Sequence, residues 1–142
     1  MRLGSVDRRH AVYRGNCHCG QVQFSIETDF PELTTCDCSI CRLRNALMVK
    51  VHESRFELLA GAEYISEYRF GTRTARHYFC KICGIYAFHR KRITPDHFGV
   101  NVFCLAGFEP AGIPVRATRG IGDVPTSSAN SGERFRADET GS

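Results

Sequence analysis

Cysteines are the residues of this 142-residue chain most able to do chemistry, and seven of the eight fall into three short clusters. The clusters are Cys17-His-Cys19, Cys36-Asp-Cys-Ser-Ile-Cys41 and Cys80-Lys-Ile-Cys83. A C-x-C pair on an extended backbone places both sulfurs on one face, because side chains alternate along a strand. A C-x-x-C pair followed by glycine is typical of a zinc-binding turn, since glycine can adopt the positive φ that directs backbone N–H groups at the sulfurs. These residue types at these spacings predict zinc bound through thiolates.

The first and third clusters together supply four thiolates, enough to close a structural zinc site. We call this set the four-cysteine group: Cys17, Cys19, Cys80 and Cys83. Its two pairs lie far apart in the sequence, so a bound metal would tie distant segments together and stabilise a modest core. Disulfides are the main alternative, disfavoured by a reducing compartment and by the strain of a C-x-C ring. The spacings fit neither common ferredoxin pattern, and haem attachment is excluded because Gly84 and Arg42 stand where histidine is required.

The middle cluster has only three thiolates and no fourth cysteine nearby. We call Cys36, Cys38 and Cys41 the three-cysteine group. Zinc held there would keep one exchangeable position, as reactive zinc sites do, so these three are the predicted catalytic residues as well as metal ligands. A metal-free redox or structural loop is the alternative.

Four further residues bear on the metal prediction. His77 is the histidine best placed to approach a second metal, whereas His18 and His97 are expected to be structural or surface residues. Cys104 falls within a strand pattern and is expected to be a small buried hydrophobic residue.

Alternation of apolar and polar residues dominates the rest of the chain and predicts a mainly β domain of antiparallel sheets. Strands are expected over residues 21–27, 46–52, 64–70, 76–80 and 98–105, while residues 55–60 could be a strand or a helical turn. No segment shows a sustained helical period. We expect an N-terminal tail over residues 1–10, the zinc-binding domain over 11–115, and an ordered strap or a disordered tail over 116–142.

Composition narrows the functional classes. Hydrophobic residues make up 42% of the chain and charged residues 24%, as in one ordinary globular domain. The formal charge of +4 would fall to about +1 if seven thiolates bound two zinc ions, so nucleic-acid binding is not indicated. The basic run His89-Arg-Lys-Arg92 is more typical of a solvated turn. With no signal-like segment and no apolar stretch of about 20 residues, the sequence predicts a cytoplasmic protein without membrane association.

The pattern of motifs resembles the glutathione-dependent formaldehyde-activating enzymes, a family that also includes the centromere protein V branch of vertebrates. The similar segments are Gly15-Asn-Cys-His-Cys-Gly-Gln-Val22, Cys36-Asp-Cys-Ser-Ile-Cys-Arg42, Phe79-Cys-Lys-Ile-Cys-Gly84 and Gly99-Val-Asn-Val102. All seven clustered cysteines match in order and spacing. The resemblance runs from about Tyr13 to Leu105, and the usual His- and Trp-containing segment is missing after Gly107.

This resemblance implies the β-tent fold, a structural zinc in the four-cysteine group and a labile second zinc in the three-cysteine group. It also implies a carbon–sulfur lyase that condenses glutathione with formaldehyde to S-hydroxymethylglutathione. Arg42 and Arg44 are the candidates to pair with the carboxylates of glutathione, and Arg73 and Arg76 are weaker ones. Two alternatives stay open: a non-catalytic zinc-stabilised binding module, and an enzyme of the same fold that acts on another thiol or aldehyde.

Overall fold

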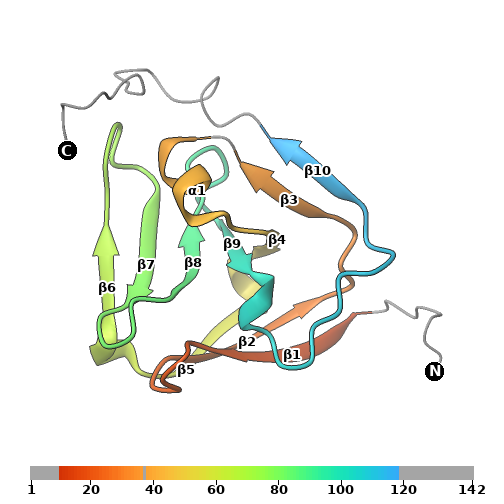
Figure 1. The fold of residues 1–142 in the computed structure, drawn as a ribbon, viewed down its shortest axis with the longest axis horizontal. Coiled ribbons are helices and arrows are strands. Elements are labelled where there is room, and N and C mark those ends of the chain that lie inside the picture. The colour runs from red at the N-terminus through yellow and green to blue at the C-terminus, as the bar shows by residue number, and fades with distance from the viewer. Residues whose placement is uncertain (1–9, 37, 119–142) are drawn as a thin grey trace.

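The computed structural model describes residues 10–36 and 38–118, which fold into two β-sheets (Figure 1). Most of the expected tails, residues 1–9 and 119–142, lies outside the described residues. The strands are β1 Ala11–Asn16, β2 Gln23–Thr28, β3 Leu33–Cys36, β4 Met48–His52, β5 Phe56–Ala60, β6 Ile65–Tyr68, β7 Arg76–Cys80, β8 Tyr86–Arg90, β9 His97–Asn101 and β10 Val115–Thr118. The short helices are α1 Ser39–Arg44 and the 3₁₀ turns η1 Glu53–Arg55, η2 Ala62–Tyr64 and η3 Val102–Cys104.

The smaller sheet has the strand order β1-β2-β5, and the larger has the order β10-β3-β4-β9-β8-β7-β6. Neighbouring strands are antiparallel except β10, which pairs in parallel with β3. The two sheets meet over the four-cysteine group at one end of the molecule. The expected mainly β, tent-like architecture is therefore confirmed.

Aromatic rings fill the space between the sheets. Phe24 on β2 and Phe88 on β8 contact edge-to-face with ring centroids 5.6 Å apart. Phe56 on β5 bridges them, with its centroid 4.6 Å from that of Phe88 and 4.5 Å from that of Phe98. Strand β2 shows the alternation that the sequence predicts, with Phe24 and Ile26 buried on one face, and each buried ring stabilises the fold by about 1.5–3 kcal/mol.

The segment 98–105 was expected to be one strand, but the strand ends at Asn101. The Asn101 side chain accepts a hydrogen bond from the Phe103 backbone N–H at 3.2 Å and begins the 3₁₀ turn η3. This local bond competes with the strand, as Asn side chains commonly do. Cys104 consequently lies in a 3₁₀ turn rather than in a strand.

Strands β1, β3, β8 and β10 were not predicted from the sequence, and neither was helix α1. It has only six residues, too few to show a helical period, and it lies inside the three-cysteine group. The Cys38 sulfur accepts a hydrogen bond from the Cys41 N–H at its start, and Asn45 ends it in the left-handed conformation at φ 54°.

Among the other expected strands, 76–80 coincides with β7, and the rest are shorter or begin later than predicted. Segment 46–52 begins as a strand only at Met48, and segment 64–70 is a strand only over Ile65–Tyr68. Segment 55–60 is resolved as strand β5, and β10 extends the large sheet beyond residue 115.

Candidate functional site

The four-cysteine group lies where two hairpin turns face each other. Cys17 and Cys19 lie in the turn between β1 and β2 of the small sheet, and Cys80 and Cys83 lie at the turn between β7 and β8 of the large sheet. All four sulfurs are within 4.8 Å of one another, with Cys17 to Cys19 at 3.6 Å and Cys19 to Cys80 at 3.7 Å. Tetrahedral zinc with Zn–S bonds of about 2.3 Å requires sulfur separations of about 3.8 Å. The donor set therefore fits a closed zinc site, and the separations are far too long for disulfides.

Both turns supply backbone donors to the sulfurs. The N–H of Val22 donates to the Cys17 sulfur, and the N–H of Ile82 donates to the Cys80 sulfur, both at 3.4 Å. Gly20 and Gly84 follow the two pairs with φ of 85° and 80°. The positive φ expected at the second glycine is confirmed, and the first turn uses the same device.

The three-cysteine group lies at the crossover from β3 to β4. Cys36 ends β3, Cys38 caps α1 and Cys41 lies in its first turn, which brings the three sulfurs within 4.8 Å of one another. The Cys36 sulfur accepts a hydrogen bond from the Cys38 N–H at 3.5 Å. Three soft thiolate donors on one side of a short helix suit zinc better than a hard cation such as magnesium.

The sulfurs of this group interact strongly with one another. Hydrogen bonds from the Cys38 and Cys41 thiols hold the pKa of Cys36 far below its usual value. The same contacts, with burial, raise the pKa of Cys41 far above it. Without a cation the group therefore holds one negative charge readily and resists further ones, so a divalent cation is the natural partner for three thiolates.

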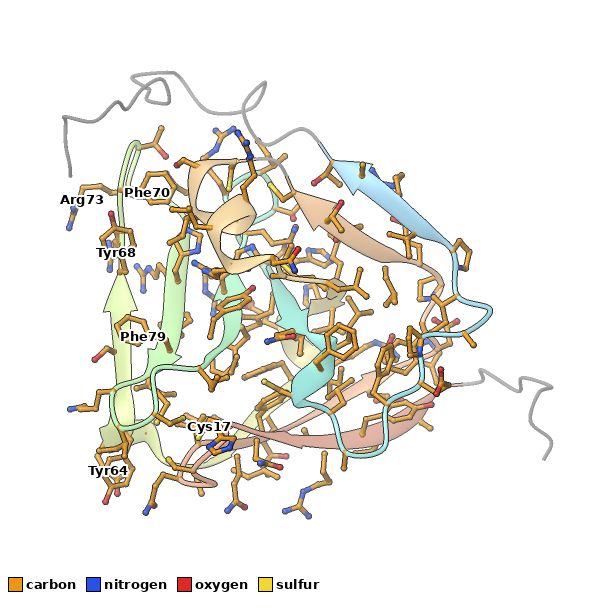
Figure 2. The ribbon with its side chains drawn as sticks, in the orientation of Figure 1. Cys17, Tyr64, Tyr68, Phe70, Arg73 and Phe79 are labelled. Atoms are coloured by element: carbon orange, nitrogen blue, oxygen red, sulfur yellow. The ribbon has the colours of Figure 1, made fainter. Side chains whose placement is uncertain are left out.

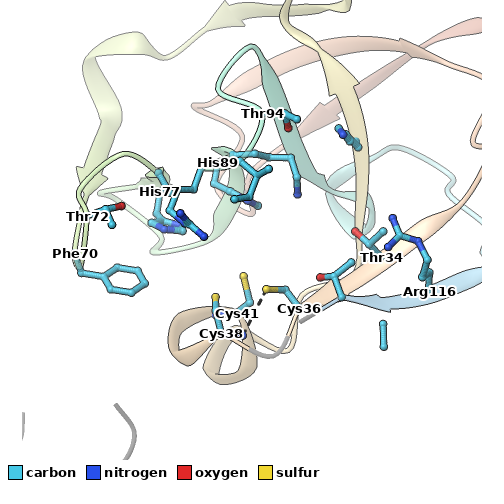
Figure 3. A pocket seen from close by; sticks show the side chains of 17 residues that line it. Thr34, Cys36, Cys38, Cys41, Phe70, Thr72, His77, His89, Thr94 and Arg116 are labelled. Atoms are coloured by element: carbon cyan, nitrogen blue, oxygen red, sulfur yellow. Dashed lines mark hydrogen bonds between the residues drawn. The ribbon is translucent and has the colours of Figure 1, made fainter. Parts of the chain in front are cut away.

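A cleft of about 440 Å³ opens beside the three-cysteine group (Figure 3). The wall across from the sulfurs is a row of residues in register on four adjacent strands: Lys50 on β4, Gly99 on β9, His89 on β8 and His77 on β7. The three side chains of this row line the cleft. In Figure 2, Cys17 and Phe70 lie at opposite ends of the molecule, so the cleft is remote from the four-cysteine group.

His77 is held in the cleft wall by ring stacking. Its imidazole is 4% exposed and lies between Phe70 at 5.5 Å and His89 at 5.3 Å between ring centroids. Neither of its ring nitrogens has a hydrogen-bond partner. Burial, helped by the Arg44 charge, lowers the pKa of His77 to about 4. The imidazole is therefore neutral at pH 7 and has one N–H donor and one lone pair, both buried and without a partner.

His89 is fixed more tightly than His77. Its Nδ1 lies 2.5 Å from the Tyr86 hydroxyl, and its ring lies over Gly99, where a Cβ would come within 2.5 Å of the ring carbon Cε1. Burial keeps the pKa of His89 well below its usual value. The glycine on β9 therefore makes the room that the imidazole on β8 occupies.

Unpartnered polar atoms gather at this cleft. Among the described residues, the buried side-chain atoms without a hydrogen-bond partner are Arg44 Nη1, His77 Nδ1, His77 Nε2, Arg92 Nη2 and Thr94 Oγ1. All but the first belong to residues that line the cleft. Each such atom costs about 1–3 kcal/mol when it stays unpaired, so their concentration in one place indicates a polar ligand.

The predicted glutathione contacts lie at a different place. Arg42 is exposed on α1, and the Arg44 guanidinium packs over the Tyr86 ring at 3.8 Å from its centroid. Neither lines the cleft, nor do Arg73 and Arg76, which are exposed. Their role in binding stays a prediction.

The remaining sequence candidates are outside both metal groups. His18 is exposed between the two ligands of its turn, and His97 hydrogen-bonds Asp96 at 2.9 Å. Cys104 is half-buried with its sulfur 3.8 Å from the Tyr86 carbonyl oxygen. His77 faces the three-cysteine group across the cleft but is not grouped with its sulfurs as a ligand.

Sequence reasoning missed His89, Arg92 and Thr94 as site residues. The signal for His89 was its pairing opposite Gly99, which needs the strand register. Arg92 ends the basic run His89–Arg92, a type of segment that is usually solvated, and Thr94 lies two residues beyond it.

The structure is that of a small mainly β protein with two cysteine groups, one of four and one of three residues, that could each hold a metal ion. Residues 12–116 match the family described as glutathione-dependent formaldehyde-activating enzyme, and the chain belongs to this family. A crystal structure of a Rhodobacter sphaeroides protein is similar, with a TM-score of 0.67 and 42% sequence identity over 72% of this chain and 99% of the other. Within the part of the chain that the structure describes, no helix is both long and apolar enough to span a membrane.

Proposed function

We propose that this protein is a cytoplasmic carbon–sulfur lyase that adds glutathione to formaldehyde and so forms S-hydroxymethylglutathione. The observation that carries the proposal is the juxtaposition, across one cleft, of an open three-thiolate group and a neutral, unpartnered imidazole, His77. Membership of the family supports glutathione and formaldehyde as the substrates.

We assign a structural zinc to the four-cysteine group and a second, labile zinc to the three-cysteine group. Zinc in the second group would supply Lewis acidity that favours the thiolate form of a substrate sulfur. The chain's own contribution is to hold the three donors on one rigid unit: β3 positions Cys36, and the cap and first turn of α1 position Cys38 and Cys41.

The reaction forms one C–S bond and breaks the carbonyl π bond, and the proton that leaves sulfur ends on oxygen. The oxygen gains negative charge as the bond forms. His77 is placed to donate its N–H to that oxygen, because its nitrogens have no competing partner in the protein. Because the pKa of His77 is lowered to about 4, its imidazole is neutral at neutral pH. Stacking between two rings fixes the direction of the donor before the substrate arrives.

Arg42 and Arg44 are proposed to bind one glutathione carboxylate on the helix side of the three-cysteine group. Arg42 is exposed there, and Arg44 keeps a free Nη1 while its guanidinium packs on Tyr86. Both would have to reach toward the cleft from outside its lining.

NMR exchange spectroscopy tests this function directly. Zinc-loaded protein should accelerate the exchange between formaldehyde and S-hydroxymethylglutathione above the rate in buffer, and Cys38→Ser should lose the acceleration while its amide spectrum keeps the native dispersion. A wild-type protein that leaves the buffer rate unchanged would overturn the proposal. Equal acceleration with any small thiol would instead favour a broader thiol–aldehyde activity of the same site.

A further inference from the structure

We propose that Arg92 and Thr94, on the loop between β8 and β9, form a carboxylate-binding subsite of the cleft and select an anionic thiol. This inference rests on the proposed function for the identity of the thiol, but not for the existence of the subsite. Both residues line the cleft, and each has a buried polar atom without a partner: Nη2 of Arg92 and Oγ1 of Thr94. A guanidinium and a hydroxyl are both hydrogen-bond donors, and a carboxylate accepts from both.

The loop that carries the subsite is held in place before any ligand binds. The Lys91 N–H donates to the His97 carbonyl at 3.0 Å, and the His97 N–H donates to the Thr94 carbonyl at 2.9 Å. Arg90 donates from Nη1 to the Pro95 carbonyl at 2.7 Å. These bonds close the loop between its two ends and do not use the free side-chain donors of Arg92 and Thr94. Preorganisation of this kind lowers the entropy cost of binding.

Apart from the three cysteines, the charged side chains that line the cleft are all cationic. Its described lining includes Lys50, Lys91, Arg92 and Arg116 but neither Asp nor Glu. Arg116 is already neutralised, because its guanidinium holds both carboxylate oxygens of Glu32 at 2.7–3.1 Å. Arg92 has no such counterion among the described residues. Away from the sulfurs the cleft therefore carries cationic side chains, and the guanidinium of Arg92 has no counterion among the described residues, which favours an anion at that end.

The size of the cleft also favours a thiol that carries a carboxylate. A volume of about 440 Å³ is within the range of about 300–1,000 Å³ that holds small organic ligands. A simple aldehyde beside the three-cysteine group would leave most of it empty. A thiol with an extended, carboxylate-bearing body would place its sulfur at the cysteines and a carboxylate at the loop.

The subsite can be tested without thiolate chemistry by using S-methylglutathione, whose sulfur is blocked, and its diethyl ester, which lacks both carboxylate charges. Dissociation constants would be measured by NMR titration of the full zinc-loaded chain. Wild type should bind the acid at least about tenfold more tightly than the ester, because hydrogen bonds to charged groups carry that much discrimination. Arg92→Gln should reduce this preference about tenfold, and the isosteric Thr94→Val about fivefold.

Arg116→Gln is the matched control. This substitution removes the same charge from the same cleft. The Arg116 guanidinium is already paired with the Glu32 carboxylate, so the preference for the acid over the ester should change by less than about twofold. The proposal is overturned if wild type binds acid and ester equally or not at all, if Arg92→Gln keeps the wild-type preference, or if Arg116→Gln loses as much as Arg92→Gln. Failure of the proposed function looks different: glutathione–formaldehyde exchange stays at the buffer rate while the preference for the acid persists.

Discussion

Replacement of His77 by phenylalanine removes two buried ring nitrogens and keeps a planar ring between Phe70 and His89. The two neighbouring rings lie 5.5 Å and 5.3 Å from the imidazole centroid, and stacking does not depend on the nitrogens. The change therefore isolates the polar atoms of one side chain. If those atoms serve only the substrate, their removal should stabilise the protein and impair the reaction together.

The structure sets the size of the stability change. An unpartnered buried polar group destabilises the folded state by about 1–3 kcal/mol, so its removal stabilises the protein. The larger phenyl ring destabilises it by about 1 kcal/mol through overpacking. The net gain in the free energy of unfolding should be about 0–2 kcal/mol for His77→Phe. For a domain of this size that corresponds to a rise in Tm of up to about 8 °C.

The effect on activity should have the opposite sign. Loss of a hydrogen-bond donor to a developing oxyanion costs about 10²-fold, so the enzyme-dependent part of the exchange rate should fall to near the buffer rate. The assay pairs thermal unfolding at saturating zinc with NMR exchange spectroscopy on the same samples. His77→Gln is the control, because it restores an N–H donor without the ring and should recover part of the activity.

Two results would refute this reasoning. A His77→Phe protein that is less stable than wild type by 1 kcal/mol or more would mean that the imidazole has a structural partner, such as a metal or an ordered water. A variant with wild-type exchange activity would remove His77 from the reaction, whatever its stability.

Other predictions follow from the same geometry. Cys38→Ser should lower the zinc content from two ions to one per chain in metal analysis, with a retained amide spectrum; two ions in the variant would contradict the three-cysteine site. Cys80→Ser should leave the chain largely unfolded by circular dichroism, because structural zinc contributes about 10 kcal/mol or more against a typical total stability of about 5–15 kcal/mol; Cys104→Ser, outside both groups, is its control. Gly99→Ala should destabilise the protein by about 1–3 kcal/mol in urea unfolding, since the new Cβ would lie 2.5 Å from the His89 ring; an unchanged stability would mean that the ring is free to move. Because the folded pKa of His77 is about 4 against 6.5 for the free side chain, the unfolded state binds more protons between these values and wild-type stability falls as pH falls. The stability gap between His77→Phe and wild type should therefore widen by about 2 kcal/mol from pH 7 to pH 5, and a constant gap would contradict the low pKa.

The metal groups could be predicted from the sequence because their chemistry is local. A C-x-C or C-x-x-C pair positions its own two sulfurs, and Gly84 indicates the turn that directs backbone N–H groups at the sulfurs. Strands β2, β4, β6, β7 and β9 were predicted for the same reason, since alternation is a property of neighbouring residues, whereas β1, β3, β8 and β10 were not predicted. The end of β9 was not predicted either, because the Asn101 side chain competes with the strand for the backbone.

The opposite wall of the cleft could not be predicted in this way. His77 and His89 are twelve positions apart, and only the register of β7 with β8 makes them neighbours. Gly99 acquires its role only because β9 lies beside β8. The free donors of Arg92 and Thr94 are invisible in the sequence, because whether a polar atom has a partner depends on every residue that packs around it.

The four-cysteine group is remote from the three-cysteine group, but it joins the two strands that carry the histidines of the opposite cleft wall. Strand β7 carries His77 and ends at Cys80, and β8 leaves the same turn and carries His89. The turn between these strands is fixed to the small sheet wherever the four-cysteine group holds its metal. The fixed turn sets the register of β7 with β8 at one end of the two strands. The register in turn places His77 beside His89 near their other end. Metal bound by the four-cysteine group would offset the stability that is lost because the polar atoms at the cleft are unpartnered. It would also hold those atoms in positions where a ligand can form hydrogen bonds with them.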